Sequence, residues 1–193
     1  IEHVYFPIDG MVSLVLGLSD GAMVEIAVVG QEGMVGWPGM IGLDSGTLEA
    51  IVQIDLTAYR FKTATLVQLT QDIPALSEAI LRSHQGLFLQ VAQSAACNQR
   101  HTSAERLAKW LLLAEDRTQG NTVSLSQEFL AMMLGIRRAG VTVAMGDLRR
   151  KGCVTNGHGR ITIINRSRLE ASACECYATL KRETERLSAP PNP

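Results

Sequence analysis

The 193-residue sequence has few aromatic residues, 5% of the total, only four cysteines, and a formal net charge of −1. So few cysteines exclude a small disulfide scaffold, and a hydrophobic content of 46% excludes a disordered or collagen-like chain. The sequence also has no apolar run of the roughly 18 residues that a membrane-spanning helix needs. We therefore expect a cytoplasmic protein of one or two folded domains that makes no membrane contact.

Histidine is scarce as well. Only His3 occurs in the first 83 residues, which is too few ligands for a cupin-like metalloenzyme, and no Ser-His-Asp or Cys-His motif of a nucleophilic enzyme is recognisable. The cysteines are too scattered for a zinc site, and their one local pair falls in a helical pattern, where residues two apart point in different directions. We expect no catalytic residues, no metal and no cofactor, and favour idle buried thiols over a redox switch for Cys97, Cys153, Cys174 and Cys176.

The small net charge conceals an uneven distribution along the chain. Residues 1–74 carry nine acidic and two basic side chains, whereas residues 117–168 carry nine basic and two acidic ones. A basic segment of this kind attracts polyanions such as nucleic acid, and the acidic half would repel them. Judged by charge alone, a basic face that only contacts solvent is favoured over a nucleic-acid-binding surface. The function must therefore be argued from other features.

Residues 1–62 read as short strands separated by turns. Nine glycines lie between Gly10 and Gly46, and the pair Asp20-Gly21 suits a hairpin turn because it tolerates positive φ. The close spacing of the turns is typical of an antiparallel β-roll or sandwich. The predicted strands are 4–6, 11–16, 23–29, 50–54 and 57–61.

From Pro74 to residue 100 the sequence has helical periodicity, with the proline suited to a first turn. This helix is apolar on two sides, so one side can cover the β-domain and the other can pair with the same helix of a second copy. A monomer that buries both stripes is the alternative. The stripe to which we assign dimerisation contains Ile80, Leu87, Val91 and Ala95, and the second contains Leu81, Phe88 and Ala92.

The pattern after residue 100 predicts three more helices. Thr102 and Glu105 form a capping box at the start of the first helix. Ser126 caps the next helix, and the third begins at about Arg138. Gly135 between these two permits the positive φ of a tight turn, which is typical of a helix-turn-helix.

Two short β-rich runs around an Asn-Gly turn at 156–157 follow the helix-turn-helix and predict the hairpin of a wing. Together with the basic excess, they favour DNA binding over a structural three-helix unit. The start of the last helix would enter the major groove. We assign base readout to Arg137, Arg138 and Thr142, and phosphate contacts to Ser126, Gln127, Lys151, His158 and Arg160.

This order of elements, with LSQEFLAMMLGIRR at 125–138, resembles the Crp/Fnr family of bacterial transcription regulators. The likeness covers nearly the whole chain, except that the first strands of the family's cyclic-nucleotide-binding-like domain are missing, so we take the chain to be N-terminally truncated. It implies an α+β fold with a jelly-roll-like sensory β-roll at 1–73, a dimerisation helix at 74–100 and a winged helix-turn-helix domain at 101–193. It also implies a homodimer on a palindromic promoter site, with double-stranded DNA and RNA polymerase as partners.

Two stretches depart from the family's pattern. Members that bind cyclic AMP use a Gly-Glu pair for the ribose, where this chain has Gly-Trp-Pro at 36–38. They use an Arg-Ser or Arg-Thr pair for the cyclic phosphate, where this chain has Leu-Glu-Ala at 48–50. A buried phosphate without a cationic partner is strongly disfavoured, so we expect no tight binding of cyclic AMP and leave the effector open. In the last helix, Ala139 and Val143 replace the family's usual Glu and Arg, which predicts an unusual DNA half-site.

We thus expect a sequence-specific DNA-binding transcription regulator and not an enzyme. The alternative is a ligand-binding or protein-interaction module whose helical hairpin does not read DNA. The concentration of arginine and lysine in the winged segment argues against this alternative.

Overall fold

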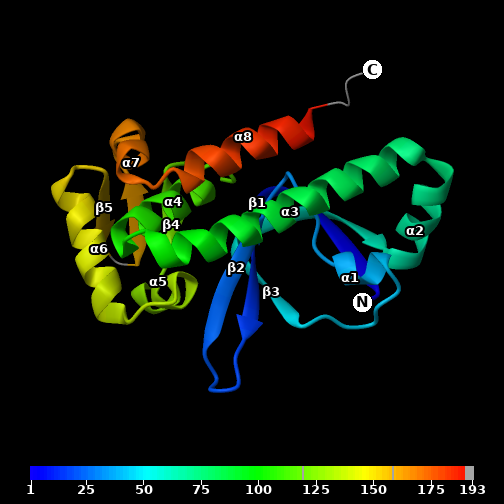
Figure 1. Cartoon of the computed structure of the whole chain (residues 1–193), viewed down its shortest axis with the longest axis horizontal. Helices are drawn as coiled ribbons and strands as arrows, with labels where there is room; N and C mark the ends of the chain where they lie inside the picture. The colour runs from blue at the N-terminus through cyan, green and yellow to red at the C-terminus, as the bar shows by residue number, and fades with distance from the viewer. Residues whose placement is uncertain (119, 158, 190–193) are drawn as a thin grey trace.

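The computed structural model describes residues 1–118, 120–157 and 159–189. Figure 1 shows an N-terminal β-domain, one long helix that runs across the molecule, and a C-terminal domain of shorter helices with a small sheet. Strands gather in the first part and helices dominate the rest. The arrangement confirms the predicted α+β fold class.

The β-domain contains one antiparallel sheet. Its strands are β1 (His3–Gly17), β2 (Met23–Val29) and β3 (Leu48–Lys62), in the order β2-β1-β3. Strand β2 has the predicted bounds, whereas β1 and β3 each join two of the predicted short strands. The register between β1 and β3 shifts near Gly10, which has a φ of 77° and where a Cβ would lie 2.2 Å from the Asp55 carbonyl oxygen. The predicted breaks are therefore irregularities within two long strands.

Two helices of the β-domain are absent from the sequence prediction. They are α1 (Trp37–Met40) and α2 (Thr63–Asp72). Leu66 of α2 is buried in a cluster with Val4 and Met34. Trp37 at the start of α1 stacks on His84 of the long helix, with the ring centroids 4.0 Å apart and the planes 12° from parallel. Both helices thus join the sheet to the long helix.

The long helix is α3 (Pro74–Arg100), with the predicted bounds. Ile80 is 5% exposed and belongs to the same buried cluster as Leu66, while Leu87 and Val91 pack against buried residues of β1 and β2. Their packing on the β-domain disfavours the assignment of dimerisation to Ile80, Leu87 and Val91, which no contact with a second chain tests. These side chains cover the β-domain of their own chain. Helical periodicity in the sequence reveals an apolar stripe, but it does not show whether that stripe packs on the same chain or on a partner helix.

A different face of α3 is exposed. Leu81 and Phe88 are 58% and 62% exposed, and Ala92 is exposed as well. Ala95, the fourth residue of the assigned stripe, is also exposed and lies on this second face, because positions 81, 88, 92 and 95 follow the spacing of one helix side. We call Leu81, Phe88, Ala92 and Ala95 the exposed stripe of α3.

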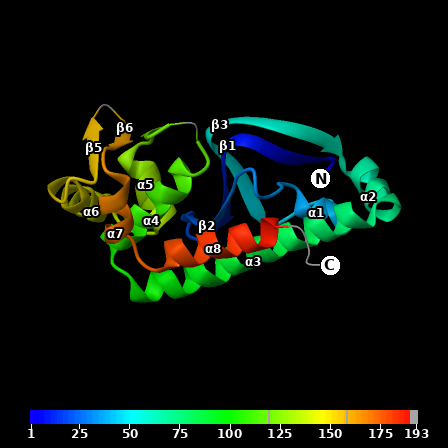
Figure 2. The ribbon, with the colours of Figure 1, turned by 90° about the horizontal axis from the view of Figure 1, so that it is seen from above.

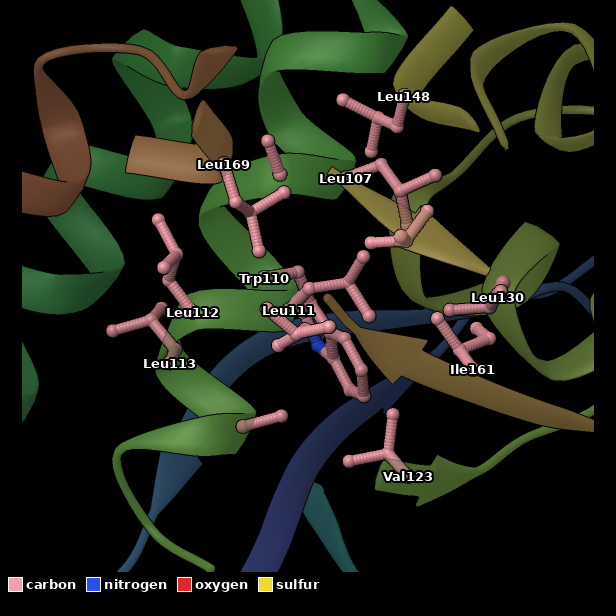
Figure 3. Close-up of a cluster of buried hydrophobic side chains, with 14 of the residues drawn as sticks. Leu107, Trp110, Leu111, Leu112, Leu113, Val123, Leu130, Leu148, Ile161 and Leu169 are labelled. Carbon is pink, nitrogen blue, oxygen red and sulfur yellow. The ribbon is translucent and has the colours of Figure 1, made fainter. Parts of the chain in front are cut away.

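The C-terminal domain is built around α4 (Ser103–Glu115), whose predicted capping box between Thr102 and Glu105 is present. The remaining elements are β4 (Thr122–Ser124), α5 (Gln127–Leu134), α6 (Arg138–Arg150), β5 (Val154–Gly157), β6 (Arg160–Ile163) and α7 (Arg166–Ser172). The strands form a sheet in the order β4-β6-β5. Figure 3 shows Leu107 and Leu111 of α4 among side chains from α5, α6 and β6, which together form one buried core.

The last described helix, α8 (Cys176–Ser188), leaves the C-terminal domain and lies along α3 (Figure 2). At its start, folding brings Cys174 and Cys176 together with Cys97 and His101 of the α3 end. The expectation of scattered cysteines is therefore wrong, because distance along the chain says little about distance between packed helices. Within the described residues, no single helix has the length and hydropathy of a membrane span. Helices α5 and α6 have that length and hydropathy only when taken together, and a bend of 99° separates them.

Candidate nucleic-acid interface

Helices α5 and α6 form the predicted helix-turn-helix. Ser126 caps α5, where its Oγ accepts a hydrogen bond from the backbone N–H of Phe129 at 3.0 Å. Gly135 ends α5 with a φ of 60°, a conformation that glycine adopts without the strain of a side chain. The bend of 99° between the two helices lies in the range of helix-turn-helix units.

Helix α6 has one buried and one exposed side. Val141, Ala144 and Leu148 are at most 3% exposed and pack into the core of the domain. Arg137 is the N-cap residue and Arg138 the first helical residue, so both stand at the end of the helix that is free to meet a ligand. The exposed residues in this half of the helix are Arg137, Arg138, Ala139, Thr142 and Val143.

A contact between α5 and α6 brings two of the assigned residues together. The Thr142 Oγ1 lies 3.3 Å from the Gln127 Oε1 and 3.3 Å from the backbone carbonyl oxygen of Arg138. A hydroxyl has one proton, so Thr142 donates to one of these oxygens at a time. Gln127, assigned to a phosphate, therefore lies beside the residues assigned to bases.

The wing hairpin lies next to the start of α5. Arg160 at the start of β6 pairs in register with Ser124 of β4, and the Leu125 N–H donates to the Gly159 carbonyl oxygen at 2.8 Å. Ser126 and Arg160 are both exposed. The structure thus brings these two phosphate candidates together, while His158, assigned to the same role, lies outside the described residues.

Lys151 lies at the other end of α6, as its C-cap residue. Its Nζ is 3.0 Å from the Asp147 Oδ2, and the Arg150 Nη2 is 3.2 Å from the Asp147 Oδ1. The hydrogen bond from Lys151 lowers the pKa of the Asp147 carboxyl. Exposed ion pairs of this kind contribute little to stability, so both cations can exchange the carboxylate for a phosphate at small cost.

Two arginines of the basic segment are instead held in ion pairs within the protein. The Arg117 side chain is 7% exposed, and its Nε and Nη2 donate to the Glu32 Oε1 at 3.0 and 2.6 Å. Arg166 donates to Glu115 and Asp116 at 2.6 and 2.7 Å. The count of basic residues in the sequence therefore overstates the charge that is available to nucleic acid.

The sequence gives no indication of a buried polar contact between the β-domain and α4. The Glu25 Oε1 accepts a hydrogen bond from the Trp110 Nε1 at 2.8 Å, and its Oε2 accepts one from the Ser13 Oγ at 2.6 Å. Burial raises the pKa of Glu25 to about 8, although these hydrogen bonds and the charges of Lys109 and Arg117 oppose the shift. The only local signal is an acidic residue inside the otherwise apolar stretch of β2.

Comparison with known proteins finds a likeness in the C-terminal domain. The family model described as the Crp-like helix-turn-helix domain matches residues 105–172, which include α4, α5, α6 and the wing. Residues 105–172 thus resemble a Crp-like helix-turn-helix domain in sequence. The resemblance to the Crp/Fnr family therefore holds where the sequence motif is strongest.

Solved structures extend the likeness beyond the Crp-like domain. FixK2 from Bradyrhizobium japonicum has a TM-score of 0.72 at 24% identity, covering 90% of this chain and 88% of that chain. TTHB099, a CRP-family regulator from Thermus thermophilus, has a TM-score of 0.70 at 22% identity, covering 89% and 88%. The regulator CLP from Xanthomonas campestris, described as c-di-GMP responsive, has a TM-score of 0.64 at 19% identity, covering 85% of each chain.

These likenesses show that the chain has the fold of Crp/Fnr-like transcription regulators, and the sequence match places the Crp-like domain at residues 105–172. TTHB099 and CLP are both described as regulators. No curated protein sequence matches the chain.

Proposed function

We propose that the protein is a sequence-specific DNA-binding transcription regulator that acts as a homodimer on a palindromic promoter site. The observation that carries the proposal is the exposed start of α6, where two arginines and a threonine face outward from a Crp-like domain. A role on bacterial DNA would put the protein in the cytoplasm, and an activator of this kind would contact RNA polymerase. No catalytic step is needed for such a role.

The proposed roles follow from side-chain chemistry. The guanidinium of Arg138 can donate two parallel hydrogen bonds to the O6 and N7 of guanine, and Arg137 is the second candidate for this contact. Thr142 can meet a thymine methyl group or donate to a base edge. The side chains of Ser126, Gln127, Lys151, His158 and Arg160 would hold phosphates, which sets the register without reading the sequence.

We propose the exposed stripe of α3 as the dimer interface, in place of the stripe that contains Ile80. Leu81 and Phe88 are large apolar side chains with 58% and 62% of their surface exposed on one helix side. Pairing with the same stripe of a second copy would remove this surface from water and form a two-stranded coiled coil. The two Crp-like domains could then bind two half-sites about one helical turn of DNA apart.

The effector of this regulator is not cyclic AMP in our proposal. Neither 36–38 nor 48–50 contains a cation for the phosphate. A cavity of about 270 Å³ between β2, α3 and α8 has Arg82 in its lining, but also the carboxylates Glu32 and Glu78. The Arg82 Nη1 already donates to the Ala189 carbonyl oxygen at 2.6 Å. Calorimetry that finds micromolar affinity for cyclic AMP would contradict this proposal.

The test of DNA readout is selection of bound sequences from random DNA, followed by fluorescence anisotropy on the selected site. Arg138→Ala should weaken specific binding by about 1 to 3 kcal/mol and leave binding to random DNA much closer to that of the wild type. Arg186→Ala is the matched control, because this arginine is exposed on α8, outside the Crp-like domain. Unchanged specific affinity of Arg138→Ala would refute the assignment.

The interaction-module alternative predicts a different salt response. Phosphate contacts release counterions, so binding to random DNA should weaken steeply as salt rises if the proposed phosphate residues are right. A weak, salt-independent interaction with DNA would favour the alternative.

A further inference from the structure

Three cysteines and one histidine converge where α3 ends and α8 begins. Cys97 lies in the last turn of α3 and His101 is its C-cap residue. Cys174 lies in the connection between α7 and α8, and Cys176 is the first residue of α8. One candidate ligand atom from each residue lies within 4.8 Å of all the others. The connection before α8 also explains why the two neighbouring cysteines can point to one place, since Cys174 is not helical.

Two distances within this cluster match the edges of a tetrahedron around one metal ion. The Cys97 and Cys174 Sγ atoms are 3.6 Å apart, and the Cys176 Sγ is 3.5 Å from the His101 Nδ1. With Zn–S near 2.3 Å and Zn–N near 2.0 to 2.1 Å, tetrahedral geometry places two sulfurs about 3.8 Å apart and a sulfur and a nitrogen about 3.5 Å apart. The sulfur separation is far from the bond length of a disulfide, which is about 2.05 Å.

Groups around the cluster are arranged as they are around metal ligands. The His101 Nε2 lies 3.0 Å from the Glu175 carboxylate, so the ring donates through Nε2 and turns the lone pair of Nδ1 toward the cysteines. The Gln93 Nε2 donates a hydrogen bond to the Cys176 Sγ at 3.0 Å, which stabilises a thiolate. Each of the three cysteines is at most 5% exposed, so the cluster is shielded from bulk solvent.

We propose that Cys97, His101, Cys174 and Cys176 bind one structural zinc ion. Three thiolates and an imidazole are a common donor set for structural zinc, and four protein ligands leave no position for a substrate or a reactive water. The compact cluster, with every pair of donor atoms within 4.8 Å, suits one ion. The proposal stands independently of the DNA-binding role, because none of the four residues belongs to the proposed interface.

The position of the site gives the ion a mechanical role. His101 ends α3, and the next residue, Thr102, caps α4 of the Crp-like domain. The ion would therefore fix the joint between the long helix and the DNA-binding domain, and would hold the start of α8 to the same point. Because the ligands come together only in the folded chain, the binding free energy of the metal adds to the stability of this joint.

Metal analysis of the full chain tests the proposal. The protein is purified under reducing conditions without chelator and without added metal, and its zinc content is measured by mass spectrometry. We expect about one zinc per chain, and a large loss of zinc in Cys174→Ser and in Cys176→Ser. Cys153→Ser is the matched control, since this cysteine is equally buried but contacts Ser172 instead of the cluster, and it should keep its zinc.

A second measurement on the unmutated chain covers the case in which the variants fail to fold. Zinc is removed with a chelator and Co²⁺ is titrated in, which should give thiolate-to-cobalt charge-transfer bands and the visible bands of a tetrahedral site at one equivalent. Absence of these bands, or iron as the bound metal, would overturn the proposal. The zinc proposal would also fail if the purified chain held less than a tenth of an equivalent of zinc with all four thiols free. A disulfide between Cys97 and Cys174 would contradict it as well. So would a zinc content that stayed unchanged in both Cys174→Ser and Cys176→Ser.

Discussion

The buried carboxyl group of Glu25 gives a pH dependence that can be measured directly. Its pKa is raised from an ordinary value of 4.5 to about 8, so the folded chain keeps this group protonated at pH 6 to 7 while the unfolded chain ionises it. Between these two pKa values the folded state binds one more proton than the unfolded state. The free energy of unfolding must therefore fall as pH rises, by up to about 1.4 kcal/mol per pH unit.

The linkage relation gives the size of the effect for one titrating group. With pKa values of 4.5 and about 8, the contribution of Glu25 to the free energy of unfolding falls by about 2.5 kcal/mol between pH 5.5 and pH 7.5. In Glu25→Gln the amide oxygen can still accept from Trp110 and the amide nitrogen can donate to Ser13, so both hydrogen bonds keep a partner. This variant should lose the pH-dependent contribution while it keeps the fold.

Urea denaturation of both proteins at a series of pH values measures this effect. The difference between wild type and Glu25→Gln isolates the one group, because every other titration, including that of His101, is common to both. Glu49→Gln is the control, since Glu49 lies exposed on β3, and its pH curve should run parallel to that of the wild type. If the curve of Glu25→Gln is also parallel to the wild type, Glu25 is not protonated in the folded protein and the reasoning is refuted.

Three further substitutions test other parts of the structure. Phe88→Glu should convert the proposed dimer to a monomer in light scattering, because it places a charge in the exposed stripe of α3; a dimer that persists would place the interface elsewhere. Arg117→Ala should lower the free energy of unfolding by about 2 to 3 kcal/mol, because it leaves the carboxylate of Glu32 without its partner. Chemical denaturation measures this free energy, and a change below about 0.5 kcal/mol would contradict the prediction. Arg160→Ala should reduce the slope of log affinity against log salt by about one unit on all DNA sequences alike, and an unchanged slope would remove this residue from the phosphate contacts.

The features that could be predicted from sequence are those that depend on near neighbours. The capping box of Thr102 and Glu105 and the left-handed Gly135 both follow from residues a few places apart, and the structure confirms them. The assignment of base readout to Arg137 and Arg138 requires exposed side chains, and both are exposed. Their roles on DNA stay predictions.

The features that could not be predicted depend on contacts between distant segments. Ile80 and Phe88 are both apolar residues of one amphipathic helix. Only the position of the sheet shows that Ile80 is buried and that Phe88 is exposed to solvent. The thiols of Cys97 and Cys174 are 77 residues apart along the chain and 3.6 Å apart in space. Proximity of this kind arises because α8 returns along α3, and no periodicity in the sequence encodes that return.

The two indole rings of the chain sit at different internal contacts. Trp110 touches the carboxyl group of Glu25 across the boundary between the β-domain and the Crp-like domain, and Trp37 stacks on His84 within the N-terminal half. Because the sequence has only two tryptophans, replacing one leaves a single indole that emits when tryptophan is excited selectively over the three tyrosines. Emission from Trp110 in a Trp37→Phe background would then follow movement at the domain boundary, and the reciprocal variant would follow movement of α1 against the long helix, without an attached dye.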